Sequence, residues 1–179
     1  MKAIRNLYAK LGVKEYYQQH GADYINPHFE HIRSLLLQNQ TRLDYSQVLD
    51  FCCGSGEVSQ VLETLGHSDT VASDPFTYEA YQRQLGKSCL RLDFKDVIRG
   101  KLAGNYSCII CSFAMHLCPP EQLYPLVQQL LQHSKTLVIL TPHKRPVLEK
   151  LDGVVLQFEG FCLTLRGKKV RLKAYGLAT

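Results

Sequence analysis

The stretch Val48-Leu49-Asp50-Phe51-Cys52-Cys53-Gly54-Ser55-Gly56-Glu57 decides the fold of this 179-residue chain. It begins with apolar residues that predict a buried strand, passes through a turn with two glycines, and continues into a helical pattern. The apolar side chains of that pattern stand at positions 58, 61, 62 and 65, on one face of a helix. Glycine lets a backbone turn sharply and approach a ligand closely, and the helix that follows directs its first N–H groups toward that ligand. The sequence therefore predicts a strand, a turn and a helix that together bind a nucleotide.

The acidic residues around this turn indicate which kind of nucleotide binds. Asp50 lies at the end of the strand, and Glu57 follows the second glycine. The pyrophosphate of a dinucleotide would lie against the turn, where both carboxylates would repel it. Ser59 also occupies the place of the third glycine in the dinucleotide fingerprint. The turn therefore argues against NAD and favours a positively charged ligand, such as S-adenosylmethionine with its ammonium and sulfonium groups.

The rest of the chain alternates between strands and helices. Strands are expected at 70–73, 90–92, 106–113 and 136–140, and helices at 57–65, 77–85 and 119–132. Such alternation requires right-handed crossovers, which predicts an α/β fold with a doubly wound, mostly parallel sheet in three α/β/α layers. After Gly153 the pattern changes to strands alone, at 154–158, 161–165 and 170–175. The sheet is therefore expected to end in an antiparallel hairpin.

From Val48 to Thr141 the chain resembles the class I S-adenosylmethionine-dependent methyltransferases. Their first motif reads apolar-apolar-Asp-x-Gly-x-Gly-x-Gly, and here the sequence is Val48-Leu49-Asp50-Phe51-Cys52-Cys53-Gly54-Ser55-Gly56. Cys52 replaces the first glycine, a departure that is acceptable if Cys52 keeps a negative φ. The resemblance implies a Rossmann-like methyltransferase fold, a single methyltransferase domain over residues 1–179, and S-adenosyl-L-methionine as the cofactor. It also implies that residues 1–45 form a helical lid over the cofactor.

Ligands of open α/β sheets lie outside the carboxyl ends of the strands, so the strand ends are where suitable chemistry is expected. Asp74, followed by Pro75, ends the second strand eighteen residues past Gly56. At that distance an acid can accept hydrogen bonds from both ribose hydroxyls, although Asp74 could instead cap the next helix. The predicted cofactor-binding residues are Asp50, Cys52, Gly54, Gly56, Asp74, Pro75, Asp93, Phe94, Ser112 and Tyr24.

The resemblance assigns roles to the remaining predicted residues. It implies that Asp93 binds the adenine amino group while Phe94 packs on the ring, and that the backbone at Ser112 meets the methionine part. For Asp93 the alternative is a solvated loop carboxylate. Tyr24 lies in the aromatic segment of the expected lid, where its π face could shield the sulfonium or simply pack an N-terminal helix.

Methyl transfer from a sulfonium is an in-line displacement, so the protein mainly positions the acceptor and excludes water. An oxygen or carbon acceptor gains from a general base. His116 and His143, which follow the fourth and fifth strands, are the candidates, and each could instead be a structural hydrogen-bonding residue. The expected function is methyl transfer to an unidentified small-molecule or macromolecular acceptor. The alternative is a non-catalytic regulatory protein that retains the fold.

The sequence narrows the acceptor only partly. The segment from Ser112 lacks the Asn-Pro-Pro-aromatic signature of amino methylation, which counts against DNA bases. A net charge of +5 is compatible with RNA or an anionic small substrate. A small molecule is favoured as the acceptor, with RNA, a protein substrate and a partner protein left open. The basic residues at 144–145 and 166–173 either meet phosphates or form a solvated strand face.

The amino-acid composition indicates the class of protein and the cellular compartment. A hydrophobic content of 45% and a charged content of 21% are typical of a soluble globular domain, and neither a membrane span nor a secretory signal is expected. The odd number of cysteines, 7, lying mostly in predicted strands, indicates a reducing compartment and a cytoplasmic location. Cys108 and Cys111 lie three apart on a strand and face opposite sides, so no metal site is expected.

Overall fold

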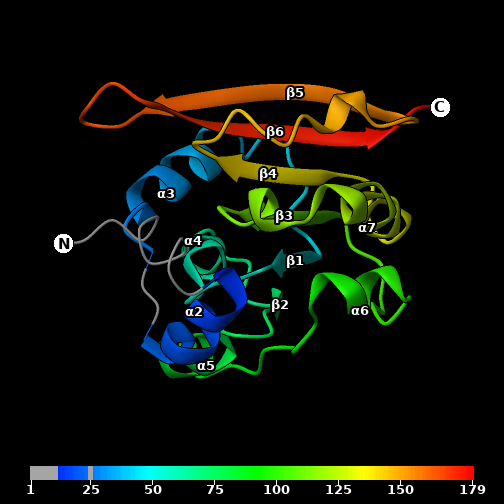
Figure 1. Ribbon diagram of the computed structural model, residues 1–179. Helices are drawn as coiled ribbons and strands as arrows, with labels where there is room; N and C mark the ends of the chain where they lie inside the picture. The colour runs from blue at the N-terminus through cyan, green and yellow to red at the C-terminus, as the bar shows by residue number, and fades with distance from the viewer. Residues whose placement is uncertain (1–11, 24–25) are drawn as a thin grey trace.

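The computed structural model describes residues 12–23 and 26–179 (Figure 1). A six-stranded sheet forms its centre, in the order β2-β1-β3-β4-β6-β5. The strands are β1 (Val48–Phe51), β2 (Val71–Ser73), β3 (Cys108–Ser112), β4 (Leu137–Thr141), β5 (Val154–Leu163) and β6 (Lys169–Leu177). β1 to β4 pair in parallel, whereas β6 pairs antiparallel with both β4 and β5. The predicted doubly wound sheet with an antiparallel end is therefore confirmed.

Helices cover both faces of the sheet and give the predicted three layers. On one face lie α3 (Phe29–Gln38) and α4 (Glu57–Thr64), whose buried side chains pack against those of β3, β4 and β6. On the other lie α6 (Phe94–Ile98) and α7 (Pro120–Gln132). α5 (Tyr78–Leu85) packs beside β2 through Tyr81. The remaining elements are α2 (Val13–His20), η1 (Gly21–Asp23), η2 (Met115–Leu117) and η3 (Leu148–Lys150).

The central strands are apolar because both of their faces are covered. Every residue of β1, β3 and β4 is buried, which explains the near-continuous hydrophobic runs in the sequence. Cys111 belongs to the core on the α7 side and Cys108 to the core on the α3 side. The two cysteines therefore lie on opposite faces of β3, as their spacing predicts. Within the described part of the chain, no helix is long and apolar enough to cross a membrane.

The predicted strand at 90–92 is wrong. Leu90 makes a single parallel bridge with Ser73, and the chain then enters α6, a helix that was not predicted from the sequence. Asp93 and Asp96 form a capping box at the start of α6: Asp96 N–H donates to Asp93 Oδ1 at 2.7 Å, and Asp93 N–H donates to Asp96 Oδ2 at 3.3 Å. This reciprocal capping stabilises a short helix that has little apolar periodicity of its own.

The terminal hairpin also differs from the expected pattern. The two strands predicted at 154–158 and 161–165 form one continuous strand, β5, which pairs with β6 along its length and contains an irregularity between Leu156 and Phe158. Gly160, between the two predicted strands, lies in the paired strand against the Asn39 side chain. The crossover between β4 and β5 contains only the single turn η3. This hairpin therefore extends the sheet beyond β4, with α3 covering one of its faces and η3 on the other.

Candidate functional site

A cavity of about 350 Å³ opens where β1, β2 and β3 end. The chain passes from β1 to β2 on one side and returns to β3 on the other, so the cavity lies where the strand order reverses. Seven of the predicted cofactor-binding residues line it: Cys52, Gly54, Asp74, Pro75, Asp93, Phe94 and Ser112. Asp50 and Gly56 support the turn without lining the cavity, and Tyr24 lies outside the described residues.

The turn after β1 has an unusual backbone. Cys52 has a φ of 58°, so the expectation that it keeps a negative φ is wrong. Cysteine therefore takes a left-handed conformation that glycine would adopt more easily. Phe113, at the end of β3, has a φ of 56° and also lines the cavity. Such conformations cost about 1–3 kcal/mol each and cluster where ligands bind.

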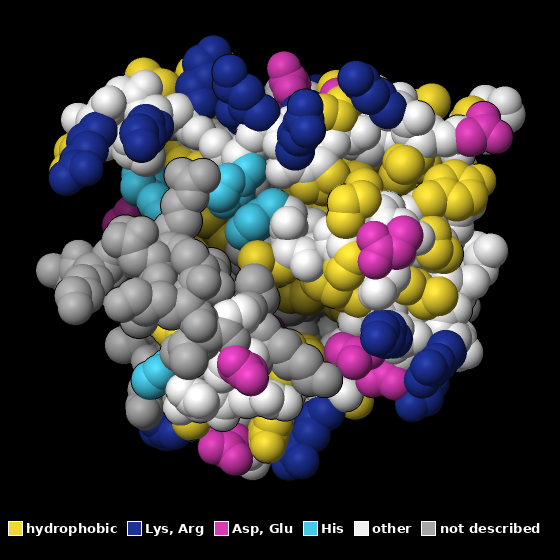
Figure 2. Space-filling view, in the orientation of Figure 1, with side chains coloured by type: hydrophobic (Ala, Val, Ile, Leu, Met, Phe, Trp, Pro, Cys, Tyr) yellow, Lys and Arg dark blue, Asp and Glu magenta, His cyan; other side chains and the backbone are white. Residues whose placement is uncertain are grey.

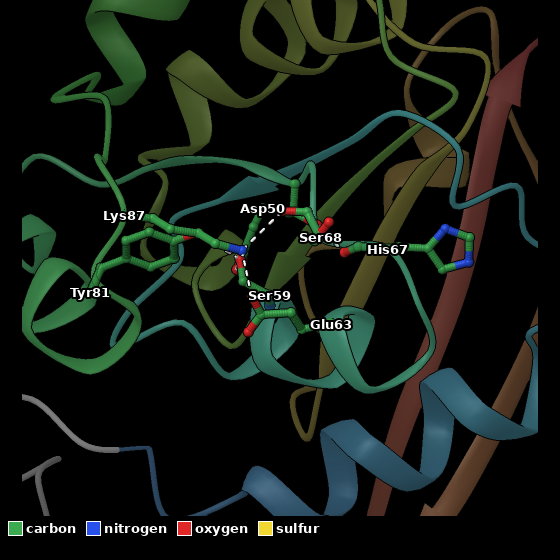
Figure 3. A network of polar contacts seen from close by, with 8 residues as sticks. Asp50, Ser59, Glu63, His67, Ser68, Tyr81 and Lys87 are labelled. Carbon is green, nitrogen blue, oxygen red and sulfur yellow. Dashed lines mark hydrogen bonds and ion pairs between the residues drawn. The ribbon is translucent and has the colours of Figure 1, made fainter.

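Asp50 lies beneath the turn and is completely buried (Figure 3). Its Oδ2 accepts hydrogen bonds from the backbone N–H of Ser59 at 3.1 Å and from Ser59 Oγ at 2.7 Å, while Tyr81 Oη donates to Ser59 Oγ at 3.2 Å. Among the described residues, Oδ1 has no hydrogen-bond partner. Burial, together with the charges of Glu57 and Asp74, raises the pKa of Asp50 to about 8, so this carboxyl is mostly protonated at neutral pH. Asp50 therefore holds the turn onto α4 and does not face the cavity.

Glu57 is the carboxylate that faces the cavity from this turn, and it was absent from the predicted site. It is only 4% exposed, and its Oε1 accepts hydrogen bonds from the backbone N–H of Asn26 at 3.0 Å and from Ser55 Oγ. The signal was present in the sequence, because Glu57 follows the second glycine at the first position of α4. Its bond to Asn26 also ties the N-terminal segment to the turn.

Asp74 is placed both to order the start of the next helix and to meet a ligand in the cavity, the two roles considered for it. Its Oδ1 accepts hydrogen bonds from the backbone N–H groups of Phe76 at 2.8 Å and Thr77 at 2.9 Å, which orders the loop into α5. The carboxylate is buried and also lines the cavity. Burial raises the pKa of Asp74, and the surrounding N–H groups oppose that rise. Glu57 and Asp74 are thus two buried carboxylates among the residues that line the cavity.

Much of the rest of the cavity wall is apolar. It includes Leu92, Phe94, Phe113, Ala114, Leu117 and Pro119. Asp93 lies beside Phe94 on this wall, with Oδ1 engaged by the capping box. A ligand with a cationic or hydroxyl-bearing part could bind the carboxylates, and a flat apolar part of the same ligand could pack on the apolar residues.

The N-terminal segment packs against the cavity. Asn26 lines it, and η1 lies beside α5. A Cβ atom at Gly21 would lie 2.2 Å from the carbonyl oxygen of Phe76, so only glycine allows this close approach. α3, by contrast, contributes Ile32, Leu35 and Leu36 to the core. α3, which falls within the predicted 1–45 lid, therefore belongs to the core, and a lid over residues 1–45 stays a prediction.

His116 and His143 lie together next to the cavity. Their ring centroids are 4.0 Å apart, and His116 falls between the lining residues Ala114 and Leu117. Burial, and to a lesser extent His143, lowers the pKa of His116 to about 4. Its Nδ1 is buried without a hydrogen-bond partner in the described structure. His116 is therefore a neutral imidazole at pH 7, able to accept a proton or a hydrogen bond.

A second pair of histidines borders the same opening. His28 stacks on Phe113 at 4.8 Å between ring centroids, and its Nδ1 lies 3.2 Å from His31 Nδ1. Figure 2 shows the histidines gathered above a hollow whose wall is largely hydrophobic. Within residues 12–23 and 26–179, no group of three or more His, Cys, Asp or Glu side chains is arranged to hold a metal ion.

Comparisons with known proteins place the chain among proteins of this fold. No protein-family model matches it. An uncharacterized protein of Schizosaccharomyces pombe, C17A5.05c, is 34% identical over 192 aligned positions, which cover 82% of this chain and 77% of the relative.

Solved structures show the same architecture at lower identity. A putative RNA methyltransferase from Pyrococcus horikoshii has a TM-score of 0.65 and 12% identity, with 100% of each chain covered. The magnesium protoporphyrin IX methyltransferase of Synechocystis, solved with bound SAM, has a TM-score of 0.61 and 16% identity over 97% of this chain and 95% of that one. The N-methyltransferase NodS of Bradyrhizobium japonicum, solved with S-adenosyl-L-homocysteine, has a TM-score of 0.63 and 15% identity over 86% and 89%. The chain therefore belongs to the family of the fission-yeast protein C17A5.05c, and its fold is that of the class I S-adenosylmethionine-dependent methyltransferases.

Proposed function

We propose that the chain binds S-adenosyl-L-methionine in this cavity and transfers its methyl group to an acceptor. The observation that carries the proposal is the pair of buried carboxylates, Glu57 and Asp74, that line a cavity whose other lining residues are largely apolar. Glu57, beside the turn, would repel the phosphates of a dinucleotide or triphosphate and attract an ammonium group, and Asp74 can accept hydrogen bonds from ribose hydroxyls. Two neighbours of this fold that were solved with SAM or S-adenosyl-L-homocysteine support the same ligand.

The lining residues fit the separate parts of this cofactor. Glu57 would take the ammonium group, close to the backbone of Cys52 and Gly54, and Asp74 would accept hydrogen bonds from the ribose hydroxyls. Asp93 and Phe94 would hold the adenine, and the backbone at Ser112 would meet the methionine part. Asp50 acts indirectly, because it holds the turn in place through Ser59.

The cofactor supplies an activated methyl group, and the chain supplies position, exclusion of water and a proton acceptor. Phe113, Ala114 and Leu117 form an apolar part of the cavity wall beside His116, so an acceptor placed there would be partly desolvated. The neutral His116 ring is the group proposed to accept the acceptor's proton during the displacement. His143 packs on that ring and is proposed to hold it in place.

The substitution Asp74→Asn is expected to weaken cofactor binding with little loss of stability. The asparagine side chain would keep an oxygen for the N–H groups of Phe76 and Thr77 but would lose the charged acceptor for the ribose. Charged hydrogen bonds of this kind contribute about 1.5–3 kcal/mol, so the Kd for S-adenosylmethionine measured by calorimetry should rise about tenfold to a hundredfold.

The matched control is Asp69→Asn, which removes an exposed carboxylate before β2, at the other end of that strand. It should bind the cofactor as the wild type does. Equal affinities for wild type and Asp74→Asn would remove Asp74 from the proposed ribose site.

His116 is expected to titrate far below an ordinary histidine. Its pKa of about 4 means that the folded state resists protonation between pH 6.5 and 4, while the unfolded chain takes up the proton. The contribution of His116 to stability is therefore complete above pH 6.5 and is lost as the pH falls toward 4. An NMR titration of the imidazole carbons, with His116→Asn used for assignment, would measure this midpoint. A midpoint near 6.5 would contradict the half-buried, neutral imidazole that the proposed base requires.

A further inference from the structure

The tip of the β5–β6 hairpin presents an uncovered sheet face. Val170 and Leu172 point into the core on the α3 side, so Lys169 and Arg171 point to the opposite face. Across the strand pair, Phe161 faces Arg171 and Leu163 faces Lys169. The short crossover η3 reaches only the other end of this face, where Glu149 binds Lys173 Nζ at 3.0 Å and Tyr175 Oη at 2.9 Å. Phe161 and Leu163 are consequently 51% and 57% exposed.

The whole net positive charge of the chain is located at this tip and in the loop beside it. Six of the 21 Lys and Arg residues lie within residues 141–148 and 160–172, together with none of the 16 Asp and Glu residues. The remaining 15 cations and 16 carboxylates nearly balance. Among the residues that the structure describes, none of the six forms a salt bridge. We call this group the hairpin cations: Lys144, Arg145, Arg166, Lys168, Lys169 and Arg171.

The hairpin cations lie at the same end of the sheet as the cavity, where the parallel strands have their carboxyl ends. β6 runs antiparallel to β4, and Arg171 pairs with Thr141, the last residue of β4. The loop that follows Thr141 carries His143, whose ring packs on His116 beside the cavity. Figure 1 shows the hairpin turn projecting past the end of β4, and Figure 2 shows Lys and Arg side chains along the surface above the histidines. The hairpin cations and the His116–His143 pair therefore lie at the same end of the sheet as the cavity.

We propose that this surface binds single-stranded RNA and directs a nucleotide toward the cavity as the methyl acceptor. The hairpin cations would contact phosphates, while Phe161 offers an exposed ring on which a base can stack; Lys169 Nζ already lies 4.3 Å from that ring's centroid. A cationic sheet face with an exposed aromatic ring suits unpaired bases, because the bases of a duplex are stacked on one another and unavailable. The acceptor role rests on the function proposed above, whereas RNA binding itself does not.

The first test measures binding of a fluorescent single-stranded RNA of about 20 nucleotides to the full chain over a range of salt concentrations. The triple variant Arg166→Gln, Lys168→Gln, Lys169→Gln changes exposed residues only. It should lower affinity at least about tenfold near 50 mM salt and reduce the slope of log K against log salt by about 2, since each single-strand phosphate contact contributes about 0.7. The matched control, Arg83→Gln, Arg99→Gln, Lys135→Gln, removes three exposed cations elsewhere and should bind within about threefold of the wild type.

The second test separates base stacking from charge. Phe161→Thr keeps a strand-forming residue but removes the ring, so affinity for single-stranded RNA should fall about tenfold while the salt slope stays unchanged. A duplex of the same length should bind more weakly than the single strand and should be insensitive to this substitution.

Three results would overturn the proposal. The first is an equal loss of RNA affinity in the hairpin triple variant and the control triple variant. The second is a duplex RNA that binds as tightly as the single strand. The third is preferential binding to vesicles of anionic phospholipid, abolished by the hairpin triple variant. The last would make this surface a membrane contact. If the wild-type chain binds RNA at this surface but does not bind S-adenosylmethionine, the proposed methyl transfer is refuted while the RNA surface stands, so the two failures are distinguishable.

Discussion

Gly56→Ala is expected to destabilise the protein by about 2–5 kcal/mol, combining a strained backbone with overpacking. Gly56 has a φ of 94°, and a Cβ atom there would lie 2.6 Å from Leu85 Cδ1 and 2.9 Å from Tyr81 Cδ2. Tyr81 also donates to Ser59 within the network that holds Asp50, so moving its ring would disturb the turn. Thermal unfolding should show a midpoint lowered by roughly 5–15 °C for a chain of this size.

Gly86→Ala is the matched control, because it shares the backbone strain of Gly56→Ala but not the overpacking. Gly86 has a φ of 67° at the end of α5, but no atom lies within 4 Å of the position its Cβ would take. Only the backbone cost of about 1–2 kcal/mol should appear. Equal losses in the two variants would mean that the contact with Leu85 and Tyr81 contributes nothing, contrary to the packing described for the turn.

Asp50→Asn is expected to stabilise the protein at alkaline pH. The folded-state pKa of about 8 lies above the ordinary value of 3.8, so between these values the folded state keeps a proton that the unfolded chain has lost. Wild-type stability therefore falls as the pH rises from about 4 to 8, by at most about 6 kcal/mol, and stays reduced above that range. Asparagine retains an oxygen for Ser59 and never ionises, so the variant lacks this loss.

Denaturant unfolding at pH 5, 7 and 9 would measure the difference between the two proteins. The advantage of Asp50→Asn over wild type should grow steadily with pH, whereas the exposed substitution Asp69→Asn should leave the wild-type profile unchanged. A constant difference across the three pH values would show that Asp50 ionises normally and is accessible to solvent.

The architecture could be predicted from the sequence because its signals are local. The strand, turn and helix around Gly54 and Gly56, and the buried runs that became β3 and β4, each carry their own periodicity or glycine pattern. α6 could not be found in this way, because it depends on the reciprocal caps of Asp93 and Asp96 more than on apolar spacing. The continuous β5 depends on pairing with β6, which no single strand reveals.

The direction of side chains around the turn was harder to predict than the turn itself. Asp50 and Glu57 lie seven positions apart in one motif, yet Asp50 points beneath the turn and Glu57 into the cavity. The difference arises from Ser59, which binds Asp50, and from Asn26 and Ser55, which orient Glu57. Ser59 was considered only as a missing glycine, although its hydroxyl decides where Asp50 points. The approach of His116 to His143 likewise required the tertiary structure.

The central claim is that the cavity at the ends of β1, β2 and β3 binds S-adenosylmethionine. Calorimetric titration of the full chain with S-adenosylmethionine and S-adenosylhomocysteine, with NAD as the control, tests it most directly. Micromolar binding of the first two and none of NAD is predicted, with Glu57→Gln weakening both. If neither sulfur compound binds, or if NAD binds with comparable affinity, the claim that the cavity lined by Glu57 and Asp74 selects S-adenosylmethionine is contradicted.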